Sequence, residues 1–199
     1  MGKINKVLFR KKVGKVLNSP KTQKRVYEMV RTRFESAKKE MVDQFDNHPV
    51  TKEIQGGAEA NNSSKTLGGY GNLFSFIGFT DKNPTAPIRS LLRSTSLSTS
   101  PRATEIRTGE FEYRFRIVMP SKQDLAKVSV MPWESGRSWL LGIEQGISGL
   151  SYYIYKKFIS ASNTRTGIQT SSPYIEGLIF RRTPYISPII NKFKISMSS

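Results

Sequence analysis

The sequence predicts an α+β fold, because it contains one long segment with helical periodicity and one with the alternation of a half-exposed strand. The strand candidate, residues 110–117, alternates apolar or aromatic side chains with charged ones. The apolar residues of the helix candidate recur at steps of three or four: Val26, Val30, Phe34, Ala37, Met41 and Phe45. Stretches rich in Gly, Pro, Ser and Asn divide the rest of the chain into short pieces.

Both ends of the long helix have recognisable signals. Ser19 followed by Pro20 is typical of an N-cap and a first helical residue. The helix is expected to end at Asn47-His48-Pro49, because proline cannot continue the hydrogen-bond ladder. His48, the only histidine, is therefore expected to be a capping or surface residue.

The segment after this helix is predicted to be a loop. Residues 50–72 are rich in Gly, Asn and Ser and have no sustained periodicity. A loop of that length in a compact domain usually has a specific function, such as binding. It leads into residues 73–79, which we interpret as a short strand with Phe74 and Phe76 on one face.

The remaining elements are predicted to be short. One helix should follow Pro84, and a second should begin near Ser138. Residues 152–159 fit either a strand or a helix. The tail from Ser171 is interrupted by prolines and is expected to end in a small helix near Ile189–Phe193.

Composition points to an assembling, basic protein. Apolar residues make up 37% of the 199, below the roughly 45–50% of a typical globular chain. We therefore expect a modest core, with some segments packing on neighbouring subunits. The net charge is +17, and residues 1–39 contain 13 Lys or Arg against two Glu. Such a concentration of charge indicates an anionic partner, either nucleic acid or an acidic protein surface.

Catalytic and metal sites have little support. The chain has no cysteine, which excludes disulfides, thiolate zinc sites and cysteine nucleophiles. No Gly-x-Ser-x-Gly motif is present, and the glycines of residues 67–71 lack the Gly-Lys-Ser/Thr of a phosphate loop. We predict no enzyme activity, no cofactor and no metal. A small Mg²⁺ nuclease using the scattered acids is the least favoured alternative.

The basic N-terminus allows more than one interpretation. No segment has the roughly 20 apolar residues of a membrane span, and lysines interrupt the first 17 residues. These residues are not expected to be a signal peptide. A transit peptide and a basic helix lying on a membrane surface are alternatives, but we favour an arm that contacts phosphate or protein, and no membrane. The apolar members of such a helix would be Val7, Leu8, Val13, Val16 and Leu17.

A nucleic-acid-binding module is the main rival. The arm and helix residues 24–39 could follow a phosphate backbone, and the aromatic and arginine side chains of residues 111–117 could stack on bases. An ordinary half-buried strand produces the same alternation, and we favour that simpler interpretation.

Three phrases of the sequence resemble a neck or tail-completion family of tailed bacteriophages. The first is Phe45-Asp46-Asn47-His48-Pro49-Val50-Thr51, with Glu53-Ile54 and Gly57 after it. The second runs through residues 67–79 and reads LGGYGNLFSFIGF. The third is WLLGIEQGISGL at residues 139–150, followed by SNTRTGIQ at 162–169. The resemblance covers about residues 20–175.

This resemblance implies a fold and a role. It implies a long N-terminal helix packed on a curved antiparallel β-sheet, with short additional helices. The chain would divide into a basic N-terminal arm (1–18), a connector domain (19–170) and a C-terminal extension (171–199). Such proteins form rings that join or complete head and tail around the DNA channel, without catalytic residues.

The function expected from the sequence is therefore that of a structural virion protein, assembled in the host cytoplasm. Its partners would be copies of itself in a ring and adjacent neck, portal or tail-tube proteins, with non-specific contact to DNA. We expect residues 3–39 to face proteins rather than the channel, because a cationic lumen would slow DNA. The predicted contacts are Lys3, Lys6, Arg10, Lys11, Lys12, Lys15, Leu67, Gly68, Gly69, Tyr70, Gly71, Asn72, Tyr174, Ile189 and Phe193.

Overall fold

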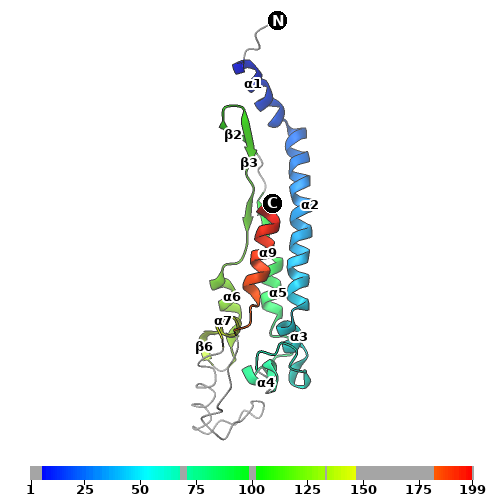
Figure 1. Ribbon diagram of the computed structural model, residues 1–199, viewed down its shortest axis with the longest axis vertical. Coiled ribbons are helices and arrows are strands. Elements are labelled where there is room, and N and C mark those ends of the chain that lie inside the picture. The colour runs from blue at the N-terminus through cyan, green and yellow to red at the C-terminus, as the bar shows by residue number, and fades with distance from the viewer. Residues whose placement is uncertain (1–5, 68–70, 99–101, 133, 147–181, 199) are drawn as a thin grey trace.

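The computed structural model describes residues 6–67, 71–98, 102–132, 134–146 and 182–198. Within these residues it combines helices with small antiparallel sheets, which confirms the predicted α+β class. Two consecutive helices, α1 (Lys6–Leu17) and α2 (Pro20–Asn47), run along one side of an elongated molecule (Figure 1). The other helices lie beside or beyond the second half of α2.

The long helix α2 forms as predicted. The Ser19 hydroxyl accepts the N–H of Thr22 at 3.4 Å, Pro20 is the first helical residue, and His48 is the C-cap. The helix buries side chains along its second half only: Phe34, Ala37, Met41, Val42 and Phe45. Val26 and Val30, on the same stripe in the first half, are half-buried. The core therefore begins about midway along α2.

Helices, rather than a curved sheet, cover this apolar stripe. The partners of α2 are α5 (Ala86–Arg93) and α9 (Ile186–Ser198). The rings of Phe34 and Phe193 meet edge to face, with centroids 6.1 Å apart. The C-terminal helix thus belongs to the same hydrophobic core as α2.

The strands of the described residues form three separate two-stranded antiparallel sheets, which corrects the expected single curved sheet. Residues 110–117, predicted as one strand, divide into β3 (Glu110–Tyr113) and β4 (Arg116–Val118). The reason is a change of partner: β3 pairs with β2 (Ala103–Arg107), whereas β4 pairs with β1 (Ser96–Ser98). The third sheet joins β5 (Val130–Met131) to β6 (Glu134–Ser138).

The strand predicted at residues 73–79 is wrong, because this segment forms α4 (Leu73–Ile77). Asn72 caps the helix by accepting the Ser75 N–H at 2.9 Å, and Gly78 ends it with a φ of +79°. Leu73 and Ile77, four residues apart, are both buried. Two flanking caps thus decide the conformation, although the aromatic composition favours a strand.

The predicted loop at residues 50–72 begins with two helical turns. These are α3 (Pro49–Gln55), which places Val50 and Ile54 in the core, and η1 (Gly57–Glu59). The short helices expected after Pro84 and near Ser138 are confirmed as α5 and α7 (Trp139–Gln145). A further helix, α6 (Lys122–Val128), was not predicted. The small C-terminal helix is confirmed and is longer than expected. Residues 152–159 lie outside the described part of the chain.

Candidate assembly surface

One end of the molecule, which we call the upper end, consists of α1, the first turns of α2 and the β2–β3 hairpin (Figure 1). The hairpin is bound to the helices by a few specific contacts. A Cβ atom added at Gly14 would lie 3.5 Å from the Phe111 ring, so this ring lies against the helix backbone. The Tyr113 hydroxyl donates to the Leu17 carbonyl at 2.7 Å. These contacts attach one side of α1 to the hairpin, whereas side chains on its other sides are exposed to solvent.

The open side of α1 exposes large apolar side chains. The exposed fractions are 60% for Val7, 55% for Leu8, 61% for Phe9 and 63% for Val16. Phe9 and Val16 lie on one helix face because they are seven residues apart, and Leu8, eight residues before Val16, borders the same face. Single exposed apolar residues are common, but several on one face indicate an interaction surface.

The basic residues predicted in the arm lie on this same helix. Lys11, Lys12 and Lys15 are exposed and Arg10 is half-buried, while Lys6 is the first residue of α1. Lys3 lies outside the described residues. The arm is thus a helix with a mixed apolar and basic surface. No helix in the described part of the chain is long and apolar enough to cross a membrane.

A second surface feature is a groove of about 450 Å³ beside α2, near the C-terminal end of α9. Arg33 joins the two helices there by donating from Nε to the Ser196 carbonyl at 2.9 Å. Lys192 forms an ion pair with Glu40 at 2.8 Å and holds the pKa of that carboxyl below its usual value. The residues that line the groove are Met29, Thr32, Arg33, Ser36, Ala37, Glu40 and Ser196.

The loop residues predicted as contacts have structural positions instead. Leu67 is 1% exposed and Asn72 is 6% exposed. Besides capping α4, Asn72 donates to the Ala58 carbonyl at 2.7 Å. Gly71 has a φ of +70°, a conformation that glycine adopts without strain. Gly68, Gly69 and Tyr70 lie outside the described residues. The structure assigns Leu67 and Asn72 to the core of this chain rather than to its surface.

The same correction applies to the C-terminal helix. Ile189 is 5% exposed and Phe193 is 3% exposed, and both pack in the core. Tyr174, the third residue predicted there, lies outside the described residues. The periodicity of Ile186, Ile189 and Phe193 would have identified an apolar face, which the prolines of the tail obscure.

A buried glutamate, which is not among the contact residues predicted from the sequence, organises the loop. Glu53 is 1% exposed, and its two carboxylate oxygens accept the N–H groups of Ser64 and Leu73, each at 2.8 Å. A buried carboxylate is costly unless its oxygens are hydrogen-bonded, and these bonds meet that need. Glu53 of α3 therefore holds both the middle of the segment that follows, at Ser64, and the start of α4, at Leu73.

A second buried polar contact joins α3 to the start of α9. The hydroxyl groups of Tyr185 and Thr51 are 2.6 Å apart, and burial raises the pKa of Tyr185 well above its usual value. The Tyr185 ring stacks on Phe45 at 5.8 Å and lies 4.8 Å from the His48 ring. His48 Nδ1 accepts the Val50 N–H at 3.3 Å, which confirms the predicted capping role. Burial lowers the pKa of His48.

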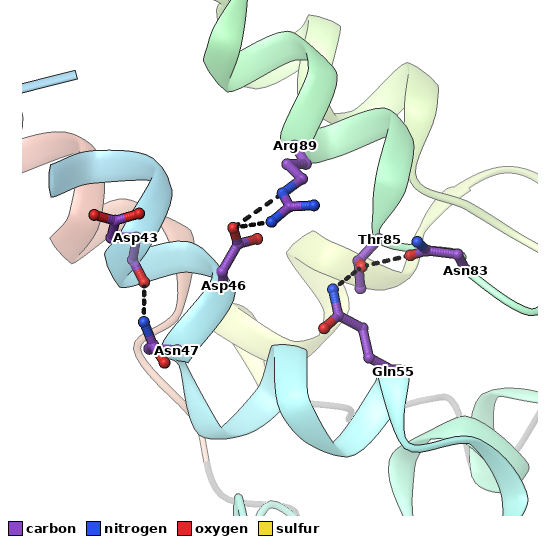
Figure 2. A network of polar contacts seen from close by, with 7 residues as sticks. All are labelled: Asp43, Asp46, Asn47, Gln55, Asn83, Thr85 and Arg89. Carbon is purple, nitrogen blue, oxygen red and sulfur yellow. Dashed lines mark hydrogen bonds and ion pairs between the residues drawn. The ribbon is translucent and has the colours of Figure 1, made fainter. Parts of the chain in front are cut away.

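Polar contacts also connect α2 and α3 to α5 (Figure 2). Arg89 forms an ion pair with Asp46, and its Nε donates to the Asp46 carboxylate at 2.9 Å. Gln55 donates to the Thr85 hydroxyl at 2.9 Å. Each contact joins side chains from different elements and so orients the helices around the core.

These polar groups join helices and loops of the chain to one another. No group of three or more His, Asp or Glu residues in the described ranges could hold a metal ion. The histidine nitrogen Nδ1 is engaged as a helix cap, and Glu53 accepts backbone hydrogen bonds. Comparison with family models, curated proteins and solved structures finds no significant match. The exposed faces at the upper end and along α2 are therefore the best candidates for a functional site.

Proposed function

We propose that this protein is a structural subunit of the neck of a tailed bacteriophage, forming a ring that joins or completes head and tail. The observation that supports this most is the exposed apolar face of α1, where Leu8, Phe9 and Val16 have more than half of their surface in contact with solvent. A subunit that functions alone would gain stability by covering these side chains. Their exposure favours a partner protein.

The shape of the molecule supports the same role. The upper end extends beyond the core on α1, the first turns of α2 and a hairpin (Figure 1). Such a projection can reach an adjacent subunit while the body stays folded around its own core. A ring subunit needs two different complementary faces, and an elongated chain offers faces that are well separated.

The mass of the purified protein tests this proposal. Light scattering would be measured on the protein alone and with candidate portal and tail proteins, at moderate and at high salt. We expect a closed oligomer or a stable complex with one of these partners. Apolar contacts should survive high salt, because screening weakens only exposed charge interactions.

A nucleic-acid-binding module is the second candidate, favoured by the exposed lysines of α1 and α2. This second function predicts a monomer that does not bind portal or tail proteins, and that binds DNA with an affinity that falls steeply as the salt concentration rises. That outcome would replace the neck proposal. A structure of an assembled ring would in addition show whether residues 3–39 face proteins, as we expect, or line the channel.

A further inference from the structure

Charge is divided unevenly along the two consecutive helices. Residues 6–33 contain ten Lys or Arg and one Glu, a net charge of +9. Residues 34–47, the second half of α2, contain two Lys and four acidic residues, a net charge of −2. One chain therefore presents a strongly basic helical surface at one end and a weakly acidic one further along.

The basic part includes a face that is also apolar. Leu8, Lys12 and Val16 recur every four residues on α1, and Phe9 lies beside them at steps of three and seven from Lys12 and Val16. All four side chains are exposed. Such a face can bury its apolar side chains together with the aliphatic part of Lys12, whose ammonium group reaches outward to water or to a carboxylate.

The groove beside α2 lies where the basic first half of the helix meets its weakly acidic second half. Its side chains include small ones, Thr32, Ser36 and Ala37, which leave room for a larger side chain from outside. Met29 is 70% exposed at one end of the groove, and Glu40 is at the other. Asp43 is exposed one turn beyond Glu40, and the carbonyl end of α9 adds partial negative charge.

The cations near the groove are already engaged within the chain. Arg33 donates to the Ser196 carbonyl, and Lys192 pairs with Glu40. The positive charges of Arg33 and Lys192 are balanced by the negative charges of Glu40 and Asp43, so the groove is close to neutral and far less positive than α1.

We propose that the occupant of this groove is α1 of a second copy of the chain. Leu8, Phe9 and Val16 of one copy would pack against Met29 and Ala37 of the next, with Lys12 and its neighbours near Glu40 and Asp43. Because α1 and the groove are different surfaces of one subunit, the contact is head-to-tail and can propagate around a ring. This inference rests on the proposed function and specifies the contact between ring subunits.

Other occupants fit less well. DNA would be attracted by the lysines but would give no reason for exposed leucine, phenylalanine and valine side chains. A membrane surface requires apolar residues segregated to one face, whereas Lys12 lies between Leu8 and Val16, and exposed Val7 is on another side of the helix.

Two substitutions should each break one half of the contact. Phe9→Glu places a charge on the apolar face of α1, and Met29→Lys places a positive charge at the groove facing a basic helix. Val118→Glu and Glu35→Gln are the matched controls, because they make the same changes in charge at exposed positions that do not line the groove. Circular dichroism would verify that every variant keeps the helix content of the wild type.

The decisive measurement is native mass spectrometry of the variants alone and mixed. Phe9→Glu and Met29→Lys should each be monomeric where the wild type and both controls are oligomeric. An equimolar mixture should give dimers only, since the intact α1 of the Met29→Lys chain can occupy the intact groove of the Phe9→Glu chain.

Each other result overturns the inference. If the wild type is oligomeric and both variants remain so, the ring uses other faces and the neck proposal stands. If the wild type binds portal or tail proteins but not itself, only the contact between copies is refuted. If it does neither, both proposals fail. A mixture that stays monomeric would show that the two surfaces are not partners.

Discussion

The body of the molecule and its upper end differ in how their aromatic side chains are used. In the body, Phe34 and Phe45 of α2 are 2% and 0% exposed and pack on Phe193 and Tyr185. At the upper end, Phe9 of α1 is 61% exposed. Both regions belong to nearly continuous helices, so helical structure alone does not determine whether an apolar side chain finds a partner within the chain.

The contrast suggests a division of tasks. The body contains the hydrophobic core, and buried polar groups such as Glu53 and Tyr185 fix how its parts meet. The upper end is attached by backbone and side-chain hydrogen bonds at Leu17 and Asn18. We expect the body to determine stability and the upper end to determine association.

The largest expected effect is the loss of a core ring. Phe45→Ala should lower the free energy of unfolding by about 3–5 kcal/mol, because it removes a fully buried aromatic side chain and leaves a cavity. Phe9→Ala should change it by less than about 0.5 kcal/mol. Urea denaturation of both variants measures the difference, and equal effects would show that the two regions fold as one unit.

The next effect concerns Glu53. Glu53→Gln should lower the free energy of unfolding by about 1.5–3 kcal/mol. The amide has only one oxygen to accept the two backbone N–H groups, and its NH₂ group would face the second N–H without a hydrogen bond. Glu59→Gln, at an exposed position of the same segment, is the control and should be nearly neutral. A neutral Glu53→Gln in thermal and urea unfolding would contradict the role of this carboxylate.

A smaller and local effect is expected at the upper end. Tyr113→Phe removes the bond to the Leu17 carbonyl and should weaken the attachment of the hairpin to α1 by about 0.5–1.5 kcal/mol. Hydrogen exchange should become faster in α1 and the hairpin, while the unfolding of the body stays unchanged. Tyr27→Phe in α2 is the control. Faster exchange throughout the body would argue against two separate regions.

The smallest effect is a pH dependence of the body. Burial lowers the folded-state pKa of His48, so the unfolded chain binds more protons between that pKa and the ordinary value near 6.5. The free energy of unfolding should therefore have its full value above about pH 6.5 and should decrease as the pH falls below it. His48→Asn keeps a capping side chain and should remove the decline near pH 6. An unchanged pH profile in that variant would assign the decline to other groups.

Local signals account for what could be predicted. The steps of three and four from Val26 to Phe45, together with Ser19, Pro20 and Pro49, defined α2 because capping and periodicity act within a few residues. The role of His48 at the helix end follows from the same signals. The exposed lysines of α1 were visible as a concentration of charge.

Signals that depend on distant partners were missed or misjudged. Residues 73–79 have the aromatic composition of a strand, but the Asn72 cap and Gly78 made a helix. The alternation of residues 110–117 was real, yet β3 and β4 pair with different strands, so no single curved sheet formed. The core positions of Ile189 and Phe193 could not be predicted from neighbouring residues, because the ring that Phe193 packs on, Phe34, lies far away in the sequence.

By itself the sequence determined the α+β class, the long helix with its caps, and the basic, partly apolar N-terminus, since each depends on neighbouring residues. Only the tertiary structure decided that α2 packs on α5 and α9, that Glu53 and Tyr185 are buried, and that Leu8, Phe9 and Val16 stay exposed. The physical reason is that burial depends on which segments meet in space, and a periodic apolar face specifies that it needs a partner without specifying which one.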